Sequence, residues 1–596
     1  MKNTVSLILL LIFIGHFELK ATHLMGGDIT YQSISPGVYK ITFKFYRDCR
    51  GIPLNSPSIT MFCETNPGSS SALNYARTSI KDITPVCSGD TNNLCNQTNT
   101  FNSGNGFEEH VFEATVDFNS GVFKQMKDAG CCKFKIQMSQ CCRNGILTTI
   151  SPGNFYVDAM MDICNIEKSN IKVNSSPLFM NLPVLKACCN KPLKYNYGAV
   201  EIQDGDSLSF ELSTPLNGNN SNENYTGNFN SQIPMTPFCP PNPGVVNCRA
   251  LPNAKPPRGF YFDKTIGDIV FTPTKCDEVG IIALQVNEWR INPEWITDKK
   301  KIKWLLIGYI KREMQVIIFN CDTVSNPPII DNTTNFFDVC EGDSINFDIK
   351  VQDQDTSDTI EMDVFHNIPN TTYQIIENSS SDKIIRVTTK TVIGDGQLAP
   401  YSFVVNAQDN SCPYVLKTSQ GFSVIIRTKP MVDRKYTEQD SQVVFEVLRN
   451  KAATYSWTIK NENDSIIKQS AHKLDSFSTE KDKTYFIKLD YQDDINCENS
   501  FFDTISTKPN LNNAIQNYHK TNVIVYPNPS GGVIKIEGIN QFTKLSVFDI
   551  FGKELMINDQ LLNKSISMIQ LQLPKGIYLL KIEDKEIFIT KKVTIY

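Results

Sequence analysis

Two groups of aspartates are the residues of this sequence best suited to bind a metal ion. Asp204 and Asp206 lie two positions apart, and Asp353 and Asp355 repeat that spacing, with Asp358 close behind. Carboxylate oxygens are the hard ligands that calcium requires, and the ion takes about six to eight of them. The spacing makes Asp204, Asp206, Asp353 and Asp355 candidate calcium ligands. Aspartate is also common in turns, and the sequence favours this turn-shaping role because Ile202 breaks the calcium-binding pattern at its first position.

Cysteine is the second residue type with a chemistry of its own. The 18 cysteines indicate an oxidising compartment in which most of them form disulfides. Cys340 and Cys412 flank one strand-rich segment, and we predict a disulfide between them. Zinc is not expected, because no CxxC pair with a nearby histidine completes a set of four ligands. Adjacent cysteines should each find a distant partner, because a bridge between neighbours departs from the usual Cα separation. Such pairs stand at 131–132, 141–142 and 188–189.

The number of cysteines in each region predicts a bridge between regions. Nine cysteines precede residue 186, which is an odd number, so at least one of them should pair with a later region. Cys164 is the candidate for that bridge, and Cys497 has no evident partner in its own segment.

Residues for catalysis are not recognisable in the sequence. Five histidines follow residue 21, and they show neither HExxH spacing nor a nearby GxSxG nucleophile motif. We therefore predict that the protein is not an enzyme. A hydrolase with an unfamiliar site before residue 185 stays open as an alternative. The histidines are His23, His110, His366, His472 and His519.

The N-terminal segment bears on the location of the protein, and the overall charge bears on its partners. Lys2 precedes an apolar run from Val5 to Phe17, and Ala21 suits the position before a cleavage site, so residues 1–21 are predicted to be a signal peptide. No later segment approaches the roughly 20 apolar residues of a membrane helix. A net charge of −5 gives no basic surface for nucleic acid.

Strands must position these residues, because the sequence predicts an all-β, multidomain chain. Alternation such as Tyr39, Ile41, Phe43 and Phe45 is typical of half-buried strands. The segment that starts at Asp204 recurs in altered form at Glu341, which indicates repeated modules. These modules resemble cadherin-like or immunoglobulin-like β-sandwiches, and the segment around Trp457 resembles the polycystic-kidney-disease (PKD-like) type. The predicted domains are residues 22–185 (Cys-rich), 186–321, 322–428 and 429–508, followed by a linker at 509–521 and a small β-sandwich at 522–596.

Three motifs in the last of these segments resemble one family. They are a Pro-Asn-Pro-Ser-Gly-Gly turn at 527–532, the stretch at 545–553 and the stretch at 573–582. Together they resemble the type A C-terminal sorting domain of type IX secretion in Bacteroidota. The resemblance implies export across the outer membrane, contact with the type IX machinery and its sortase-like protease, and a product that is attached to the surface or released.

The region before residue 185 resembles secreted proteins described as gliding-motility-associated. The resemblance rests on the opening at 22–27 and on the segments at 46–51, 141–144 and 174–177. The resemblance implies a location rather than a chemistry. Because no catalytic motif is recognisable, we expect a non-catalytic adhesin or structural surface protein that binds an unknown glycan or protein. A secreted hydrolase or carbohydrate-binding accessory protein is the alternative.

Overall fold

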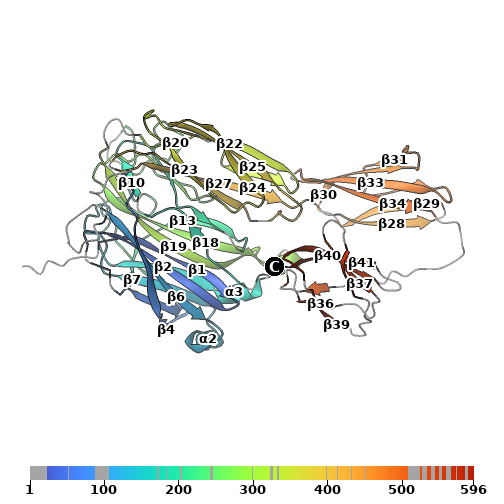
Figure 1. Cartoon of the computed structure of the whole chain (residues 1–596), viewed down its shortest axis with the longest axis horizontal. Coiled ribbons are helices and arrows are strands. Elements are labelled where there is room, and N and C mark those ends of the chain that lie inside the picture. Colours follow the sequence, from blue (N-terminus) through green and yellow to red (C-terminus); the bar gives the residue numbers. More distant parts are fainter. Residues whose placement is uncertain are drawn as a thin grey trace, which may run out of the picture. The chain divides into compact units, whose positions relative to one another are not determined.

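The computed structural model describes residues 23–507 and 524–595 apart from short internal gaps, of which the longest are 88–94, 96–105 and 559–565. The predicted signal peptide at 1–21 and the predicted linker at 509–521 lie outside the described residues. The all-β fold class is confirmed, since almost every element is a strand arranged in small sheets (Figure 1). The chain forms two compact units, residues 1–506 and 507–596.

The first unit begins with an N-terminal body, residues 24–319, built around one 14-stranded sheet. Its central path is β4-β3-β7-β8-β19-β1-β2-β6-β5. The strands are β1 (Leu24–Ser35), β2 (Val38–Asp48), β3 (Ser58–Cys63), β4 (Asn66–Ala72), β5 (Tyr75–Asp82), β6 (Phe107–Asp117), β7 (Lys133–Gln140), β8 (Phe155–Asp162) and β19 (Trp304–Phe319). Further strands are β10 (Leu185–Cys188), β13 (Ser207–Ser213), β14 (Leu216–Gly218), β15 (Ser221–Asn222) and β18 (Val279–Ile291), and two helices are α2 (Gly121–Asp128) and α3 (Ile163–Lys168).

The predicted domain boundary at residue 185 is wrong, because it divides this sheet. Strand β19 comes from the later segment but pairs with β1 on one side (Gly26 opposite Met314) and with β8 on the other (Gly308 opposite Met161). Figure 1 shows green β19 among the blue strands of the earlier segment. Residues of both segments also share one apolar core. The sequence concealed this arrangement, since periodicity predicts strands but not which distant strands pair.

Two glycines explain how β1 fits between its neighbours. A Cβ atom at Gly26 would lie 2.2 Å from the carbonyl oxygen of Glu313 in β19. A Cβ atom at Gly27 would lie 2.6 Å from the carbonyl oxygen of Lys44 and 2.7 Å from the Met138 side chain. Only glycine permits such close approach of the strands at this point.

The alternation predicted for β2 is confirmed. Tyr39, Ile41, Phe43 and Phe45 are all buried, while the residues between them are less so. Small sheets complete the body: β11 (Leu193–Asn196) with β17 (Asp268–Phe271) and β16 (Tyr261–Phe262), and β12 (Ala199–Val200) with β9 (Leu178–Phe179). The short helix α4 (Pro293–Thr297) connects β18 to β19.

The second sandwich, residues 329–427, consists of two four-stranded sheets. One is β20-β22-β25-β24 and the other is β21-β27-β26-β23. Their inner faces enclose a core of its own that includes Ile349, Val387 and Phe403. The strands are β20 (Ile329–Ile330), β21 (Phe336–Cys340), β22 (Ser344–Gln352), β23 (Glu361–His366), β24 (Thr371–Asn378), β25 (Asp382–Lys390), β26 (Tyr401–Gln408) and β27 (Lys417–Arg427).

The third sandwich, residues 433–506, packs around Trp457, which is fully buried as expected for a core strand. Its sheets are β28-β29-β32 and β31-β30-β33-β34. The strands are β28 (Asp433–Gln439), β29 (Gln442–Arg449), β30 (Ala452–Lys460), β31 (Ile466–Ser470), β32 (Leu474–Ser478), β33 (Thr484–Asp493) and β34 (Glu498–Ser506).

The second unit is a small sandwich with its own core, which includes Ile534, Val547 and Leu580. Its sheets are β35-β36-β39 and β38-β37-β40-β41. The strands are β35 (Ile524–Tyr526), β36 (Val533–Glu537), β37 (Lys544–Phe548), β38 (Glu554–Asn558), β39 (Ile566–Gln570), β40 (Gly576–Glu583) and β41 (Phe588–Ile595).

All 18 cysteines form disulfides, but three predictions about them are wrong. Cys340 pairs with Cys497 and Cys412 pairs with Cys87, so no bridge joins Cys340 to Cys412. Each of these two bridges connects one module to another. The sequence positions of Cys340 and Cys412, at the edges of one module, could not reveal such pairings. The bridge between regions starts from Cys87, because Cys164 pairs with Cys132. The adjacent cysteines 141 and 142 do bond to each other. The remaining bridges are 49–95, 63–131, 188–321, 189–276 and 239–248.

Candidate functional site

A cleft lined by both polar and apolar side chains lies between the N-terminal body and the second sandwich, with a volume of about 220 Å³. The body contributes Asn181, Lys186 and Tyr195 to its lining, and β23 and β27 of the second sandwich contribute Glu361, Asp363 and Lys417. Ligand sites form preferentially at such junctions between modules. This cleft is therefore the candidate functional site.

The joint that forms the cleft is held by hydrogen bonds between buried polar groups. The backbone N–H of Asn196 in β11 donates to Ser419 Oγ in β27 at 2.7 Å. Two residues further along β27, the N–H of Gly421 donates to Asp268 Oδ1 at 2.8 Å. Burial raises the pKa of Asp268 to about 7, while Lys194 and the hydrogen bonds from the Asn196 side chain and the Gly421 N–H act in the opposite direction. The body and the sandwich thus meet through groups that satisfy one another away from water.

A covalent bond and a short β-bridge fix the same joint at another point. Cys87 of the body bonds to Cys412 of the second sandwich. Beside that bond, Val86 and Tyr414 form an antiparallel bridge, and the N–H of Val415 donates to the carbonyl oxygen of Pro85 at 3.2 Å. Pro85 and Val415 both line the cleft. The cleft walls are therefore held in place before any ligand binds.

Lys186 is half-buried between aromatic rings from both sides of the joint. Its Nζ atom lies 3.0 Å from the ring centroid of Tyr414 and 5.2 Å from that of Phe107. Burial and the nearby charge of Arg50 lower the pKa of Lys186 to about 7, although Asp48 acts in the opposite direction. The cation of Lys186 therefore responds to pH near neutrality.

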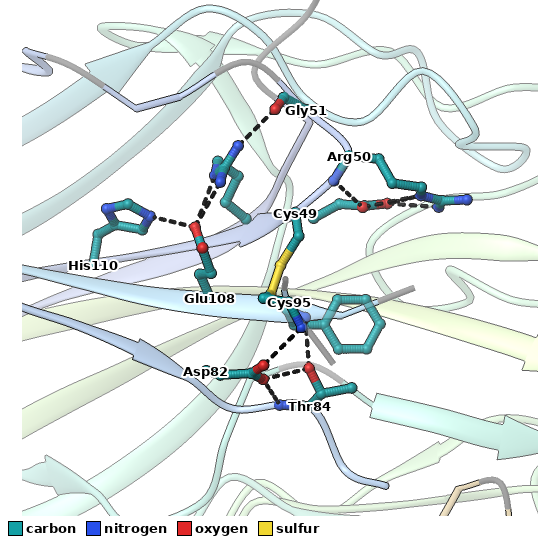
Figure 2. The surroundings of a disulfide bond; sticks show 11 residues. Cys49, Arg50, Gly51, Asp82, Thr84, Cys95, Glu108 and His110 are labelled. Atoms are coloured by element: carbon teal, nitrogen blue, oxygen red, sulfur yellow. Dashed lines mark hydrogen bonds and ion pairs between the residues drawn. A yellow bond between two sulfur atoms is a disulfide. The ribbon is translucent and has the colours of Figure 1, made fainter. Parts of the chain in front are cut away.

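Figure 2 shows the surroundings of the disulfide between Cys49 and Cys95, near the end of β2 and the start of β6. Cys49 and Cys95 bond to each other, and Asp82 Oδ2 accepts a hydrogen bond from the Cys95 N–H at 2.8 Å. Glu108 accepts from Arg47 at 2.6 Å, and His110 Nε2 lies 3.0 Å from the same carboxylate. The hydrogen bond from His110, followed by Arg47, holds the pKa of Glu108 at about 2. Since the two cysteine sulfurs are bonded to each other, they are not thiolate ligands for a metal.

Asp204 and Asp206 accept hydrogen bonds from protein groups inside the body, and calcium binding at these two residues stays a prediction. Arg290 donates to both oxygens of Asp206, at 2.7 and 2.6 Å. Asp204 Oδ2 accepts from the Ser175 N–H at 2.5 Å. Asp206 and Arg290 therefore form a buried ion pair, whereas the Asp204 carboxylate is held by a backbone hydrogen bond.

The two residues of the second predicted pair, Asp353 and Asp355, have different partners. Asp355 accepts hydrogen bonds from the backbone and side chain of Asn326, at 2.5 and 2.9 Å. Asp353 instead faces Asp358 and Asp409, and the three carboxylates offer oxygens within 4.8 Å of one another. Burial and the neighbouring aspartates raise the pKa of Asp353 to about 6. Sequence reasoning missed Asp409, which directly follows β26.

Comparison with known proteins identifies one part of the chain. Residues 524–596 match the family described as the secretion system C-terminal sorting domain. These residues are a type IX C-terminal sorting domain. The sorting domain directs export to the cell surface or the extracellular space. Along the described part of the chain, no helix combines the length and apolar character that crossing a membrane requires.

Similarity elsewhere is low. No curated protein matches the chain. Among solved structures, a biofilm associated protein (BSP domain) is 9% identical with a TM-score of 0.15, covering 98% of each chain. Dimeric latent PorU from Porphyromonas gingivalis is 10% identical with a TM-score of 0.15, covering 44% of this chain and 32% of its own. At these TM-scores no function can be transferred from either structure.

Proposed function

We propose that the protein is a non-catalytic surface binding protein, an adhesin or structural surface component, that recognises its partner in the cleft between the N-terminal body and the second sandwich. The observation that supports this most is the cleft itself, whose two walls are joined by the Cys87–Cys412 disulfide. The sorting domain directs the protein to the cell surface or the extracellular space, where it can meet such a partner. A preformed site loses little conformational entropy on binding.

The lining indicates the kind of partner. Burial lowers the pKa of Lys417, whereas the nearby charges of Asp363 and Glu361 raise it. Amides and hydroxyls from Asn406, Gln408 and Ser419 complete a surface of mixed charge. Such a surface suits a neutral polar group with many hydroxyls or amides. A volume of about 220 Å³ accommodates one sugar unit or one peptide side chain of a larger surface glycan or protein.

A binding experiment tests this function. The full-length secreted protein is applied to glycan and protein arrays, and each positive ligand is then measured with Lys417→Ala. We expect that variant to weaken binding about tenfold or more, because it removes a hydrogen-bond donor from the lining. Lys264→Ala, an exposed lysine outside the cleft lining, is the matched control and should bind as the wild type does. Equal binding by all three proteins would place recognition elsewhere.

The cleft also supports a second candidate, a secreted hydrolase or carbohydrate-binding accessory protein. Glu361 and Asp363 alternate along β23 and both line the cleft. Strand geometry separates such neighbours by roughly 7 Å, which is compatible with the carboxylate pair of an inverting glycosidase. Glycoside hydrolysis that disappears in Glu361→Gln and in Asp363→Asn, while array binding persists, would favour the hydrolase over the adhesin.

A further inference from the structure

Three carboxylates converge at one end of the second sandwich. Asp353 directly follows β22, Asp409 directly follows β26, and Asp358 lies in the segment between β22 and β23. Each offers a carboxylate oxygen, and these oxygens lie within 4.8 Å of one another. Asp353 and Asp409 are 6% and 2% exposed, so two of the three charges are withdrawn from water.

The hydrogen bonds of the cluster leave one oxygen without a partner. Asp409 accepts from the N–H groups of Ser411 and Leu416, at 3.1 and 2.7 Å, and from Ser411 Oγ at 2.8 Å. Ser411 Oγ also lies 3.1 Å from Asp358 Oδ2. Asp353 Oδ1 accepts from the N–H of Asp355 at 2.9 Å, whereas the buried Asp353 Oδ2 has no hydrogen-bond partner among the described residues. A buried acceptor without a partner is costly, and it is more so beside like charges.

No side-chain cation offsets these charges within the described part of the chain, where none of the three aspartates forms an ion pair with lysine, arginine or histidine. The body provides the contrast, because its buried Asp206 and Asp28 each pair with an arginine at 2.6 Å. The cluster is thus built for a positive charge that the protein's own side chains do not supply.

We propose that Asp353, Asp358 and Asp409 bind a calcium ion. The donors are all oxygens, which calcium prefers and zinc does not. Oxygens up to 4.8 Å apart are compatible with two ligands on one ion at the Ca–O distance of about 2.3–2.6 Å. Magnesium requires shorter bonds of about 2.0–2.1 Å in strict octahedral geometry.

The location of the site gives the ion a mechanical role. Asp409 Oδ1 holds both ends of a loop, since it accepts from Ser411 and from Leu416. That loop carries Cys412, which bonds to Cys87, and Tyr414, which covers Lys186. Calcium would therefore brace the loop that connects the second sandwich to the N-terminal body. This inference stands apart from the proposed function, because the ion can bind whether or not the cleft is the recognition site.

Calcium titration of the full-length secreted protein, freed of metal with a chelator, tests the site. Calorimetry should show calcium binding, and millimolar calcium should raise the melting temperature by about 5 °C. Asp353→Asn should abolish both effects, because the amide keeps an oxygen but removes the charge. Asp355→Asn is the matched control two positions away: its carboxylate accepts from Asn326, so the calcium response should remain.

Asp358→Asn provides a second ligand variant that is less buried, in case Asp353→Asn does not fold. It should weaken calcium binding at least tenfold while the disulfide map stays unchanged. The proposal is overturned if calcium neither binds nor shifts the melting temperature of the wild type. It is equally overturned if magnesium acts as strongly as calcium, or if Asp355→Asn loses the response as Asp353→Asn does.

Discussion

The joint between the N-terminal body and the second sandwich differs from the joint between the second and third sandwiches. The first combines the Cys87–Cys412 bond with a β-bridge at Val86 and with buried hydrogen bonds between β11 and β27. At the second joint, the Cys340–Cys497 bond links the modules. A covalent bond limits how far two modules separate, whereas buried hydrogen bonds also fix their orientation. We therefore expect the first joint to be rigid and the second to behave as a tether.

Removing each disulfide in turn should distinguish the two joints most strongly. The bonds close loops of 325 and 157 residues, so each serine pair should lower the free energy of unfolding by up to about 5 kcal/mol. Small-angle scattering should show a broader range of conformations for Cys340→Ser with Cys497→Ser. The pair Cys87→Ser with Cys412→Ser should keep the wild-type profile below its melting temperature, because hydrogen bonds still hold the first joint.

The short bridge between Cys239 and Cys248 is the control for disulfide loss alone, since it closes a loop of only 9 residues. Its serine pair should cost about 2–3 kcal/mol and leave the scattering profile unchanged. Broadening in the Cys87 and Cys412 variant, but not in the Cys340 and Cys497 variant, would reverse the comparison.

A single glycine should report on the hydrogen-bonded part of the first joint. A Cβ atom at Gly421 would lie 2.7 Å from Asn196 Nδ2 and 3.2 Å from Asp268 Oδ1. We expect Gly421→Val to lower the free energy of unfolding by about 1–3 kcal/mol, because the strands must separate to admit the side chain. Denaturant unfolding measures this loss. Gly68→Val is the control, since the nearest atom to its Cβ is 3.6 Å away, and it should change stability by less than about 0.5 kcal/mol.

The sequence predicted the elements at these joints better than their connections. The related segments at Asp204 and Glu341 do lead into strands, β13 and β22, as the repeat suggested. Yet β13 pairs with β18 inside the large sheet, whereas β22 pairs with β20 and β25 in a separate sandwich. Local patterns establish which residues alternate toward a core. The strand that completes the sheet, however, comes from a distant segment.

The candidate sites show the same contrast between local patterns, which the sequence reveals, and contacts between distant segments, which it does not. The sequence drew attention to Asp353 through its aspartate-rich segment, but it could not supply Asp409, which folding of the sandwich brings beside it. It also gave no sign of Lys186 or Lys417, because a cleft between two modules depends on how the modules dock. The sorting domain was recognisable because its motifs lie within one short segment.

Lys186 should make the first joint sensitive to pH. Its folded pKa of about 7 lies below the ordinary lysine value of 10.5, so between these values only the unfolded chain holds the proton. Stability should therefore rise as the pH increases from 7 toward 10.5. Lys186→Met removes this contribution, so its stability relative to the wild type should be greatest near pH 6 and should decline by pH 9. Melting temperatures measured across that range, with the exposed Lys264→Met as control, provide the test.

The smallest effect should come from charges at the second joint. Arg427 at the end of β27 pairs with Asp338 at 2.7 Å, and both side chains are about one-third exposed, at 32% and 38%. The hydrogen bond with Asp338 contributes most to raising the pKa of Arg427, and Asp493 and Asp494 of the third sandwich add to it. Exposed pairs contribute about 0.2–1 kcal/mol, so Arg427→Met should reduce stability by no more than that.

Arg386 pairs with Asp348 in the same sandwich and is the matched comparison. If charges of the third sandwich hold the second joint, Arg427→Met should broaden the scattering profile at low salt while Arg386→Met does not. Identical profiles for the two variants would mean that the Cys340–Cys497 bond acts at this joint without electrostatic help.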